Sequence, residues 1–504
     1  MSPTSSSPVP AIAPAIAPRP RRRPLGAAVL FLGSFLLAAI IILSGRVGTG
    51  ESADQINYHV PVIQTFASQL PSPDLSKYDS ATTPGYHLVM AVVWKLTGAH
   101  QRWPDTVPAA PVSAGPTPEF PRRTLDPDER AAWSAFIRDL APLQLLNALL
   151  TSGLIVTVYW LASRFVVWWL ALALTLPLAL NQYVLGAAIW LTTDNVGWFF
   201  ALAALACAMT LTCARGVTHA AAWTTAAVLV RQVHLWVCAP IALAGVLAWL
   251  VGHRERRTTL AMTVVGCAVP TAVVAAFAFM WGGLTPPSPR IREVHGGGIS
   301  FAALPFALSL FGAYALVLFP AWRDQLRTLA RHRTVYVGLA LLALASALIV
   351  ATSTQQPTLT DPPMRGYGWL WRASALFPPV ADRSPALALG APMGILLLAM
   401  LVRAARERGH GKQALILLAG LAAWLLAQMV NPAAWQRYFD PIILVGVAWF
   451  AALAAPPERK RALAIAAVAL ALFMAALSAR SIGRDLRSNE LPFDGGVLKM
   501  QGKL

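Results

Sequence analysis

Residues 25–45 read LGAAVLFLGSFLLAAIIILSG and contain no charged side chain. A transmembrane helix needs about 20 mostly apolar residues, so this run is long enough to cross a bilayer. It is longer than the apolar region of a cleaved signal peptide, which has roughly 7 to 15 residues. We therefore interpret it as an uncleaved first span. A polar stretch that begins ESADQINYHVPVIQTF at residue 51 follows it directly.

The composition extends this interpretation to the whole chain. Of the 504 residues, 57% are hydrophobic and 12% are charged, and the mean hydropathy is +0.57. A soluble protein needs roughly a quarter charged residues, so a soluble fold is excluded. The net charge of +18 comes from basic residues in short groups between apolar runs. That pattern indicates membrane topology and contact with anionic lipid, and no nucleic-acid partner.

Apolar runs of spanning length recur along the sequence. We expect an all-α polytopic membrane protein with about 11 to 13 transmembrane helices, because about 20 apolar residues make one span. The runs lie at 25–45, 141–163, 166–182, 195–214, 218–234, 235–252, 258–281, 301–321, 335–353, 386–403, 413–430, 437–455 and 461–479.

The basic residues predict the orientation of these spans. Dense basic groups occur at 253–257, 323–333, 403–412 and 458–461, and strict alternation places all of them on the side of the N-terminus. Loops rich in Lys and Arg are typically cytoplasmic. We therefore expect a disordered basic cytoplasmic tail at 1–24, a membrane domain at 25–480 in the plasma membrane, and an extracytoplasmic tail at 481–504.

The longest loop outside the membrane is predicted at 46–140, and it contains two candidate surface helices. In LDPDERAAWSAFIRDLAP (125–142), Asp126 can cap a helix that begins at Pro127. The apolar residues Trp133, Phe136, Ile137 and Leu140 then recur at helical spacing, as in a helix lying on a membrane. In TTPGYHLVMAVVWKLTG (82–98), Thr83 and Pro84 form a similar start.

Polar residues gather in six places that this topology sends to the same, extracytoplasmic side. Burying such residues at membrane depth costs free energy, so they mark candidate functional positions. They are Asp54; Thr193 and Asp194; Arg231, Gln232 and His234; Arg290, Arg292, Glu293 and His295; Arg365 and Arg372; and Arg437, Tyr438 and Asp440.

Each position also has a structural interpretation. Asp54 could solvate a loop, Asp194 could cap the following helix, and His295 stands beside three glycines of a loop. Arg372 could bind lipid phosphate, and Arg437 could extend to the membrane surface from a span end. For Arg231 and Gln232 the functional interpretation is favoured over the structural one, because a merely structural arginine in an apolar run would need a buried partner. The gathering of all six positions on one side favours a site.

The residue types indicate the chemistry of such a site. Arginine presents a planar set of donors that matches phosphate oxygens, so a lipid-linked phosphate is the expected ligand. A carboxylate nearby could take the proton of an attacking hydroxyl. Together they predict transfer of a phosphate-activated group to an alcohol.

Four segments also resemble a known family. DQINYHVPVIQTF and YDSATTPGYHL resemble the first luminal loop of the dolichyl-phosphate-glucose-dependent α-1,2-glucosyltransferases, which reads similarly to DEIFHIPQAQ and WDPKITTPPGLYL. TTD at 192–194, RQVHLWV at 231–237 and QRYFDPII at 436–443 resemble that family's YTD, RQTNIVWV and RYF segments. The chain differs in having Gln55 after the acid, in the segment REVHGGG, and in an insert at 99–125.

That family belongs to the GT-C class of multispan glycosyltransferases. The resemblance implies a hexosyltransferase that takes its sugar from a polyprenyl phosphate and transfers it outside the cytoplasm. It also implies that a carboxylate of the first outer loop is the catalytic base, and this maps onto Asp54. It assigns substrate contacts to Asp194, Arg231 and Gln232. We expect further substrate contacts from His295, Arg372 and Arg437. The Ala-, Arg- and Pro-rich composition indicates a bacterial relative using undecaprenyl or decaprenyl phosphate.

Several alternatives stay open on the sequence alone. A lipid-linked sugar transporter or flippase, a surface-polysaccharide ligase, and an O-mannosyl or aminoarabinose-type transferase would act on related substrates. The acceptor could be a glycan, a lipid or a protein, and the membrane lipids are expected partners. A divalent cation is a possible cofactor, although no segment offers a specific set of metal ligands.

Overall fold

The fold is described from a computed structural model. It describes residues 22–45, 54–103, 123–124, 127–211, 213–250, 256–288, 291, 298–350, 368–431, 435–487 and 490–491. The predicted tail at 1–24 therefore lies almost wholly outside the described residues. So do Asp126, Arg365 and the segment 292–297 with His295.

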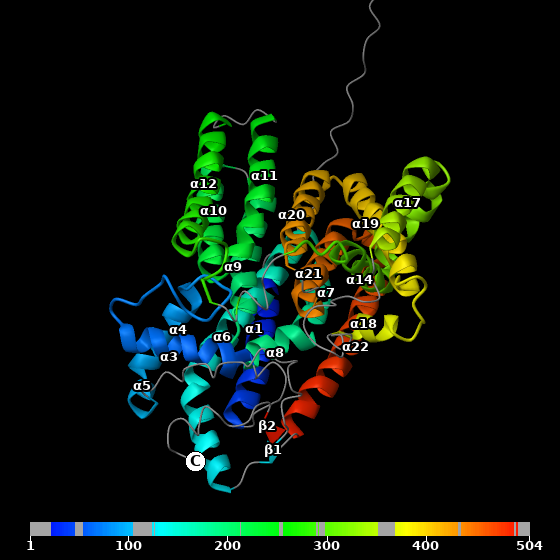
Figure 1. The fold of residues 1–504 in the computed structure, drawn as a ribbon. Helices are drawn as coiled ribbons and strands as arrows, with labels where there is room; N and C mark the ends of the chain where they lie inside the picture. The colour runs from blue at the N-terminus through cyan, green and yellow to red at the C-terminus, as the bar shows by residue number, and fades with distance from the viewer. Residues whose placement is uncertain are drawn as a thin grey trace, which may run out of the picture.

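Helices make up nearly all of the described chain (Figure 1). In the first half they are α1 (Arg23–Leu43), the π-helical turn η2 (Gln55–His59), α3 (Val60–Gln69), α4 (Gly85–Leu96), α5 (Ala99–Arg102), α6 (Pro127–Phe165), α7 (Trp168–Ala179), α8 (Gln182–Ile189), α9 (Asp194–Met209), α10 (Ala214–Val230), η3 (Gln232–Val237) and α11 (Cys238–Leu250). In the second half they are α12 (Arg256–Trp281), α14 (Ala303–Val317), α15 (Phe319–Trp322), η4 (Arg323–Gln325), α16 (Leu326–Leu329), α17 (Arg333–Ile349), α18 (Trp369–Ser374), α19 (Pro385–Glu407), α20 (Gly411–Met429), α21 (Gln436–Ala454), η5 (Pro457–Arg459) and α22 (Lys460–Arg487).

The predicted all-α polytopic architecture is confirmed. Among the described residues, eight helices are long and apolar enough to cross a membrane, or up to ten if each of two bent pairs is one span. Every predicted span overlaps a helix, including the expected break between 218–234 and 235–252, where α10 ends and η3 leads into α11. Two of the remaining apolar helices, α9 and α17, are shorter than 18 residues.

In two places the chain bends sharply between two helices, although the sequence predicted a continuous span followed by a loop there. The axes of α7 and α8 differ by 70°, and α14 meets the segment 319–329 at 91°. Asn181 stands at the first break, where its side chain accepts hydrogen bonds from the backbone N–H groups of Tyr183 and Val184 and so caps α8. The segment predicted as a loop at 183–194 is therefore mostly a helix that crosses the bundle (Figure 1).

The first outer loop forms a small helical module from α3, α4, α5 and the outer part of α6. Its core includes Phe66, Trp94 and Phe136, all fully buried, and Trp103 lies edge-on to Phe136 at 4.9 Å. The predicted helix start at Pro127 is confirmed, but the separate surface helix expected over 127–140 is instead the first part of the single helix α6. Its apolar side chains Phe136 and Ile137 pack against the module rather than facing a lipid surface.

The second surface helix forms at α4, but its predicted cap does not. Pro84 precedes the first helical residue, and no side chain caps the helix. The Thr83 hydroxyl donates instead to the carbonyl oxygen of Val228, at the end of α10, over 2.5 Å. This bond fastens the loop to the membrane bundle.

Helix α21 lies at the centre of the bundle, and every one of its residues except Arg437 is buried. It packs against α6, α7, α14, α19 and α20. Near the C-terminal end of α21, residues of the predicted basic segments contact one another. Arg459 pairs with Asp324 at 2.5 Å, and Gln325 donates a hydrogen bond to Glu407 at 2.6 Å. Its N-terminal end carries Arg437, about 28 Å away for a helix of 19 residues. Among the described residues, the basic groups around Arg459 and the polar residues around Arg437 thus lie at opposite ends of α21.

Two short strands join the first outer loop to the end of the chain. Strand β1 (Arg123–Thr124) pairs antiparallel with β2 (Glu490–Leu491), with Arg123 opposite Leu491. Residues 490–491 therefore lie beside residues 123–124 (Figure 1).

Candidate functional site

Four charged residues from distant segments form two ion pairs. Arg437 at the start of α21 binds Asp54 just before η2, through Nη1 and Oδ2. Arg231, between α10 and η3, binds Asp194 in the first turn of α9. All four side chains are largely buried, with between 17% and 29% of each exposed. The structure thus brings together four of the seven residues that the sequence singled out.

Tyr438 joins the two pairs. The guanidinium carbon of Arg437 lies 5.0 Å from the centre of the Tyr438 ring, and that of Arg231 lies 5.4 Å from the same centre. Arg437 also donates to the Tyr438 hydroxyl at 3.1 Å and lies over the ring of Trp435 at 4.5 Å. Aromatic faces attract cations, so these rings hold both guanidinium groups in place without neutralising them.

A break in the helix positions Arg231. Its backbone is extended, with φ −150° and ψ 119°, and this single residue separates α10 from η3. The break packs against α9 at Gly197, where an added Cβ would come within 2.5 Å of His234 and 3.5 Å of Arg231 Cδ. Only a residue without a side chain permits this approach, which brings Arg231 to Asp194.

Gln232 follows Arg231 but has a different environment. Its Oε1 accepts a hydrogen bond from the Thr83 backbone N–H at 3.1 Å. Its Nε2 donates to the carbonyl oxygens of Ala81 at 2.7 Å and Leu284 at 2.8 Å. Both amide hydrogens are used, so this side chain fastens two loops to the bundle. The role in substrate binding predicted for Gln232 stays a prediction that these contacts do not favour.

Gln55 ties the two acids of the site to each other. Its side chain is fully buried, and its Oε1 accepts hydrogen bonds from the Leu191 backbone N–H at 2.8 Å and from Gln144 Nε2 at 3.0 Å. Leu191 lies three residues before Asp194. The sequence showed only that Gln55 replaces a second acid; the structure shows that its amide supports the turn carrying Asp194.

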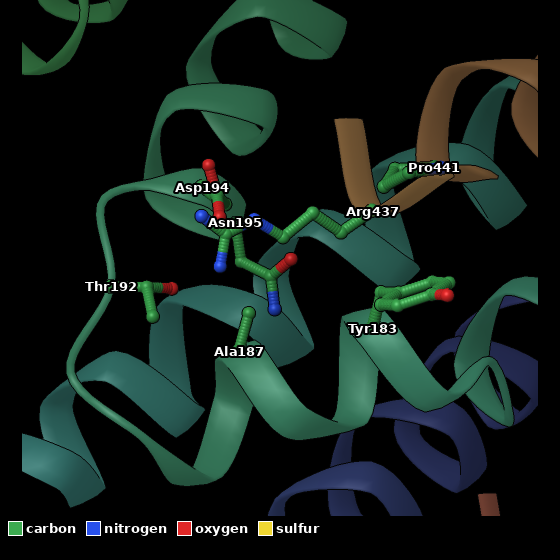
Figure 2. Close-up of a pocket in the computed structure, with 7 residues that line it drawn as sticks. All are labelled: Tyr183, Ala187, Thr192, Asp194, Asn195, Arg437 and Pro441. Atoms are coloured by element: carbon green, nitrogen blue, oxygen red, sulfur yellow. The ribbon is translucent and has the colours of Figure 1, made fainter. Parts of the chain in front are cut away.

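A pocket is lined by one residue of each ion pair, Asp194 and Arg437 (Figure 2). It is narrow and partly open to solvent. Arg437 extends from α21 toward Asp194 and Asn195 at the start of α9, and Ala187 of α8 lies on the opposite wall (Figure 2). The hydroxyl of Thr192, which also lines this pocket, is buried and has no hydrogen-bond partner among the described residues.

A buried acid lies one helical turn beyond Arg437. Asp440 is fully buried and accepts hydrogen bonds from Asn181 at 2.8 Å, Tyr314 at 2.7 Å and Gln436 at 3.0 Å. Gln436 in turn accepts from the backbone N–H of Leu370 at 3.0 Å. These bonds hold the start of α21 against α8, α14 and α18, and therefore position Arg437 and Tyr438.

Two further residues, Arg372 and His295, were predicted to contact the substrate. Arg372 is exposed on α18, whose backbone is bound to Gln436 as described above. His295 lies outside the described residues. The described part of the chain has no group of three or more His, Cys, Asp and Glu side chains placed to hold a metal ion. The cation that we named as a possible cofactor therefore stays a prediction.

Sequence inspection did not select His59 and His87. His59 Nδ1 lies 3.0 Å from His87 Nε2, and the two rings are stacked with centres 5.2 Å apart. Burial, together with the positive charges of Arg231 and Arg437, lowers the pKa of His59 from 6.5 to about 3. The proximity of His59 to Asp54 in the sequence was the one signal that could have found it.

Comparison with known proteins gives one structural likeness to report. No family model matches the chain, and no curated protein matches it. Among solved structures, the crystal structure of ArnT from Cupriavidus metallidurans bound to undecaprenyl phosphate aligns with 91% of this chain and 78% of its own, at 15% sequence identity and a TM-score of 0.36. A likeness at this level assigns neither a family nor an activity, so the function must be argued from the site.

Proposed function

We propose that this protein is a membrane glycosyltransferase of the GT-C class. It moves a hexose from a polyprenyl-phosphate carrier to a hydroxyl group of a glycan, lipid or protein acceptor, on the extracytoplasmic face. One observation carries the proposal: two acid–arginine pairs meet at the ring of Tyr438, beside a pocket that Asp194 and Arg437 line, at the end of α21 opposite Arg459 and Asp324. Basic loops are typically cytoplasmic, so this pocket opens to the other side.

The two arginines suit the leaving group of this reaction. When the bond between the anomeric carbon and the carrier oxygen breaks, the phosphate gains a second negative charge. Arg231 and Arg437 lie against one ring and come from segments far apart in the chain, so both can donate to the same phosphate. Donors held in place before the reaction stabilise charge as it develops.

Asp54 is the proposed proton acceptor. The acceptor hydroxyl attacks the anomeric carbon as its proton passes to Asp54, and the polyprenyl phosphate leaves. One displacement inverts the configuration at that carbon. A positioned base of this kind typically contributes 10²- to 10⁴-fold to the rate.

The ion pairs give the site a way to respond to its donor. In this arrangement the pocket has room only for a water-sized molecule, far less than a usual ligand pocket of roughly 300 to 1,000 Å³. A donor phosphate that binds Arg437 competes with Asp54 for the same guanidinium. Its binding would free the carboxylate to face the acceptor and would enlarge the pocket. Asp194 keeps Arg231 oriented, and Thr192 offers a hydroxyl to the sugar.

The position of the pocket suits a lipid-linked substrate. Arg437 and Arg231 stand at the ends of candidate spans, where the phosphate of a membrane carrier would lie. The apolar chain of the carrier can then remain in the bilayer while its sugar enters the pocket. Undecaprenyl or decaprenyl phosphate would be the carrier in a bacterium.

Reconstituted protein provides the direct test. Purified protein in lipid nanodiscs would be given a polyprenyl-phosphate hexose and candidate acceptors identified by comparing lipid-linked sugars and surface glycans of cells with and without the protein. We expect Asp54→Asn to lower transfer by at least about 10²-fold while polyprenyl phosphate still binds. Asp74→Asn, in an exposed part of the same loop, is the control and should transfer normally. Near-normal turnover by Asp54→Asn would contradict the proposal.

A further inference from the structure

The turn that follows Asp54 has an unusual geometry. Residues Gln55–His59 form a π-helical turn, in which the Val60 backbone N–H bonds to the Gln55 carbonyl oxygen. In such a turn each backbone N–H bonds to the carbonyl oxygen five residues earlier. Two residues that are five positions apart are therefore separated by roughly one full turn. In an α-helix the same spacing would rotate the later residue by about 140°. The π-helical turn therefore brings His59 toward the face that carries Asp54.

The sequence spacing explains why such a turn is needed. In the segment that this loop resembles, DEIFH, the histidine is the fourth residue after the acid. Here DQINYH places it fifth, so the chain has one extra residue between Asp54 and His59. Residues four apart share a face of an α-helix. Widening one turn absorbs the extra residue and keeps His59 on that face; π-bulges of this kind frequently occur at functional sites.

His87 fixes the orientation of the His59 ring. It is fully buried on α4, and its Nε2 lies 3.0 Å from His59 Nδ1. His87 Nδ1 has no hydrogen-bond partner among the described residues. A buried N–H without an acceptor is rarer than a buried acceptor without a donor, so His87 is assigned its proton on Nε2. His87 then donates to His59 Nδ1, and His59 carries its own proton on Nε2.

His59 is thus an uncharged donor next to charged ones. Its ring is partly exposed, and with Nδ1 engaged by His87 only Nε2–H remains for a ligand. The nearby Arg231 and Arg437 help to lower the pKa of His59 to about 3, so the ring is neutral at ordinary pH. A neutral donor adds a hydrogen bond without adding a third positive charge to a buried site.

We propose that His59 is a substrate-binding residue whose Nε2–H donates to a phosphate oxygen of the lipid-linked donor, beside Arg231 and Arg437, with His87 holding it in the required tautomer. The inference rests on the proposed function, because it takes the ligand to be a polyprenyl phosphate. It adds a binding residue that the charged clusters did not include.

The test measures binding separately from transfer. Undecaprenyl phosphate alone, without a sugar, is titrated into nanodisc-embedded protein, and donor KM and kcat are measured in parallel. Because a hydrogen bond to a charged group is lost, we expect His59→Leu to weaken undecaprenyl phosphate roughly ten- to a hundredfold and to raise donor KM similarly. His59→Gln should retain most of the affinity, because its amide N–H can donate from a similar position.

Two further variants separate the proposal from trivial effects. His87→Phe should weaken binding several-fold while leaving His59 in place, because the ring then loses the partner that sets its tautomer. His219→Leu, on an exposed part of α10, is the control and should bind normally. If His59→Leu does not fold, judged by its thermal transition, His87→Phe and His59→Gln decide the outcome.

The outcomes are distinguishable. If the wild-type protein binds undecaprenyl phosphate and transfers sugar, but His59→Leu and His87→Phe bind equally well, the role of His59 is wrong and the proposed function stands. A fall in kcat with unchanged binding would also overturn the role, since it would place His59 in the chemical step. If the wild type neither binds nor transfers, both proposals fail.

Discussion

Asp54 and Arg437 lie 383 residues apart in the sequence and form an ion pair at the start of α21. The pair joins the first outer loop to the central helix of the bundle. A second pair, Asp194 with Arg231, comes from the middle of the chain and meets the first at the ring of Tyr438. The site is therefore assembled only when all three regions pack together.

The arginines should not be replaceable by lysine. Lysine has a single ammonium group, whereas Arg437 uses one nitrogen for Asp54 and another for the Tyr438 hydroxyl. We expect Arg437→Lys and Arg231→Lys each to raise donor KM by roughly ten- to a hundredfold, the cost of losing a hydrogen bond to a charged group. Steady-state kinetics with a polyprenyl-phosphate hexose would measure this. Arg403→Lys, at the basic end of α19, should behave as wild type.

Gln232 should matter for stability more than for binding. In Gln232→Glu the new oxygen would face the carbonyl oxygens of Ala81 and Leu284, where the amide now donates. Leaving buried polar groups unpaired costs about 1 to 3 kcal/mol each, so we expect a clear fall in the thermal transition. Gln101→Glu, on an exposed face of α5, is the matched control. A variant that is as stable as wild type but binds donor poorly would favour the original prediction of a substrate contact.

Asp440, one helical turn beyond Arg437, should not be replaceable by asparagine. Asp440 accepts from Asn181 through one oxygen and from Tyr314 and Gln436 through the other. Asn181 cannot rotate its amide, because its oxygen caps α8. In Asp440→Asn, either orientation of the new amide sets donor against donor, at a cost of about 1 to 3 kcal/mol. We expect reduced thermal stability and weaker donor binding.

A second substitution tests the same region from the other side. Gly368 has φ +155°, and an added Cβ would overlap the Gln436 side chain. Gly368→Ala should therefore disturb the bond from Leu370 and weaken donor binding in the same direction as Asp440→Asn. Gly338→Ala, where a Cβ meets nothing within 4 Å, provides the control. Normal binding in both test variants would show that this network does not position Arg437.

The stability should depend on pH through the histidine pair. Burial lowers the pKa of His59 to about 3 and that of His87 well below 6.5. Both rings therefore stay neutral in the folded protein just below pH 6.5, and that of His59 stays neutral down to about pH 3, whereas the unfolded chain takes up protons there. Stability is complete above pH 6.5 and falls as the pH drops toward 3, by at most about 1.4 kcal/mol per pH unit for each ring. Thermal transitions at several pH values would measure the slope, which His87→Phe should reduce.

Chelation tests the predicted divalent cation. Asp54 and Asp194 each already bind a guanidinium group, so their charge is balanced within the protein. We expect transfer to continue at an unchanged rate after treatment with excess EDTA. A loss of activity that Mg²⁺ or Mn²⁺ restores would instead show that a cation binds together with the donor phosphate.

The sequence predicted the helices well because a span is a local property. Any run of about 20 apolar residues must satisfy its backbone hydrogen bonds within itself in a bilayer, and this holds whatever the rest of the chain does. The limits of that argument appear at 127–140. The apolar face of this segment could contact either lipid or protein, because the spacing of its apolar residues is the same in both cases. The structure shows that it contacts protein, since Phe136 packs against Trp103.

What the sequence determined by itself was the class of protein, the number of spans to within a few, and the residues whose charge is costly at the membrane. What only the tertiary structure decided was which of those residues meet. Arg231 and Gln232 are neighbours in the sequence, yet one faces an acid of the site and the other holds two loops. The direction in which a side chain points at a helix break depends on the residues that pack against the break. Here these residues are Gly197 and Thr83, and both come from other segments of the chain.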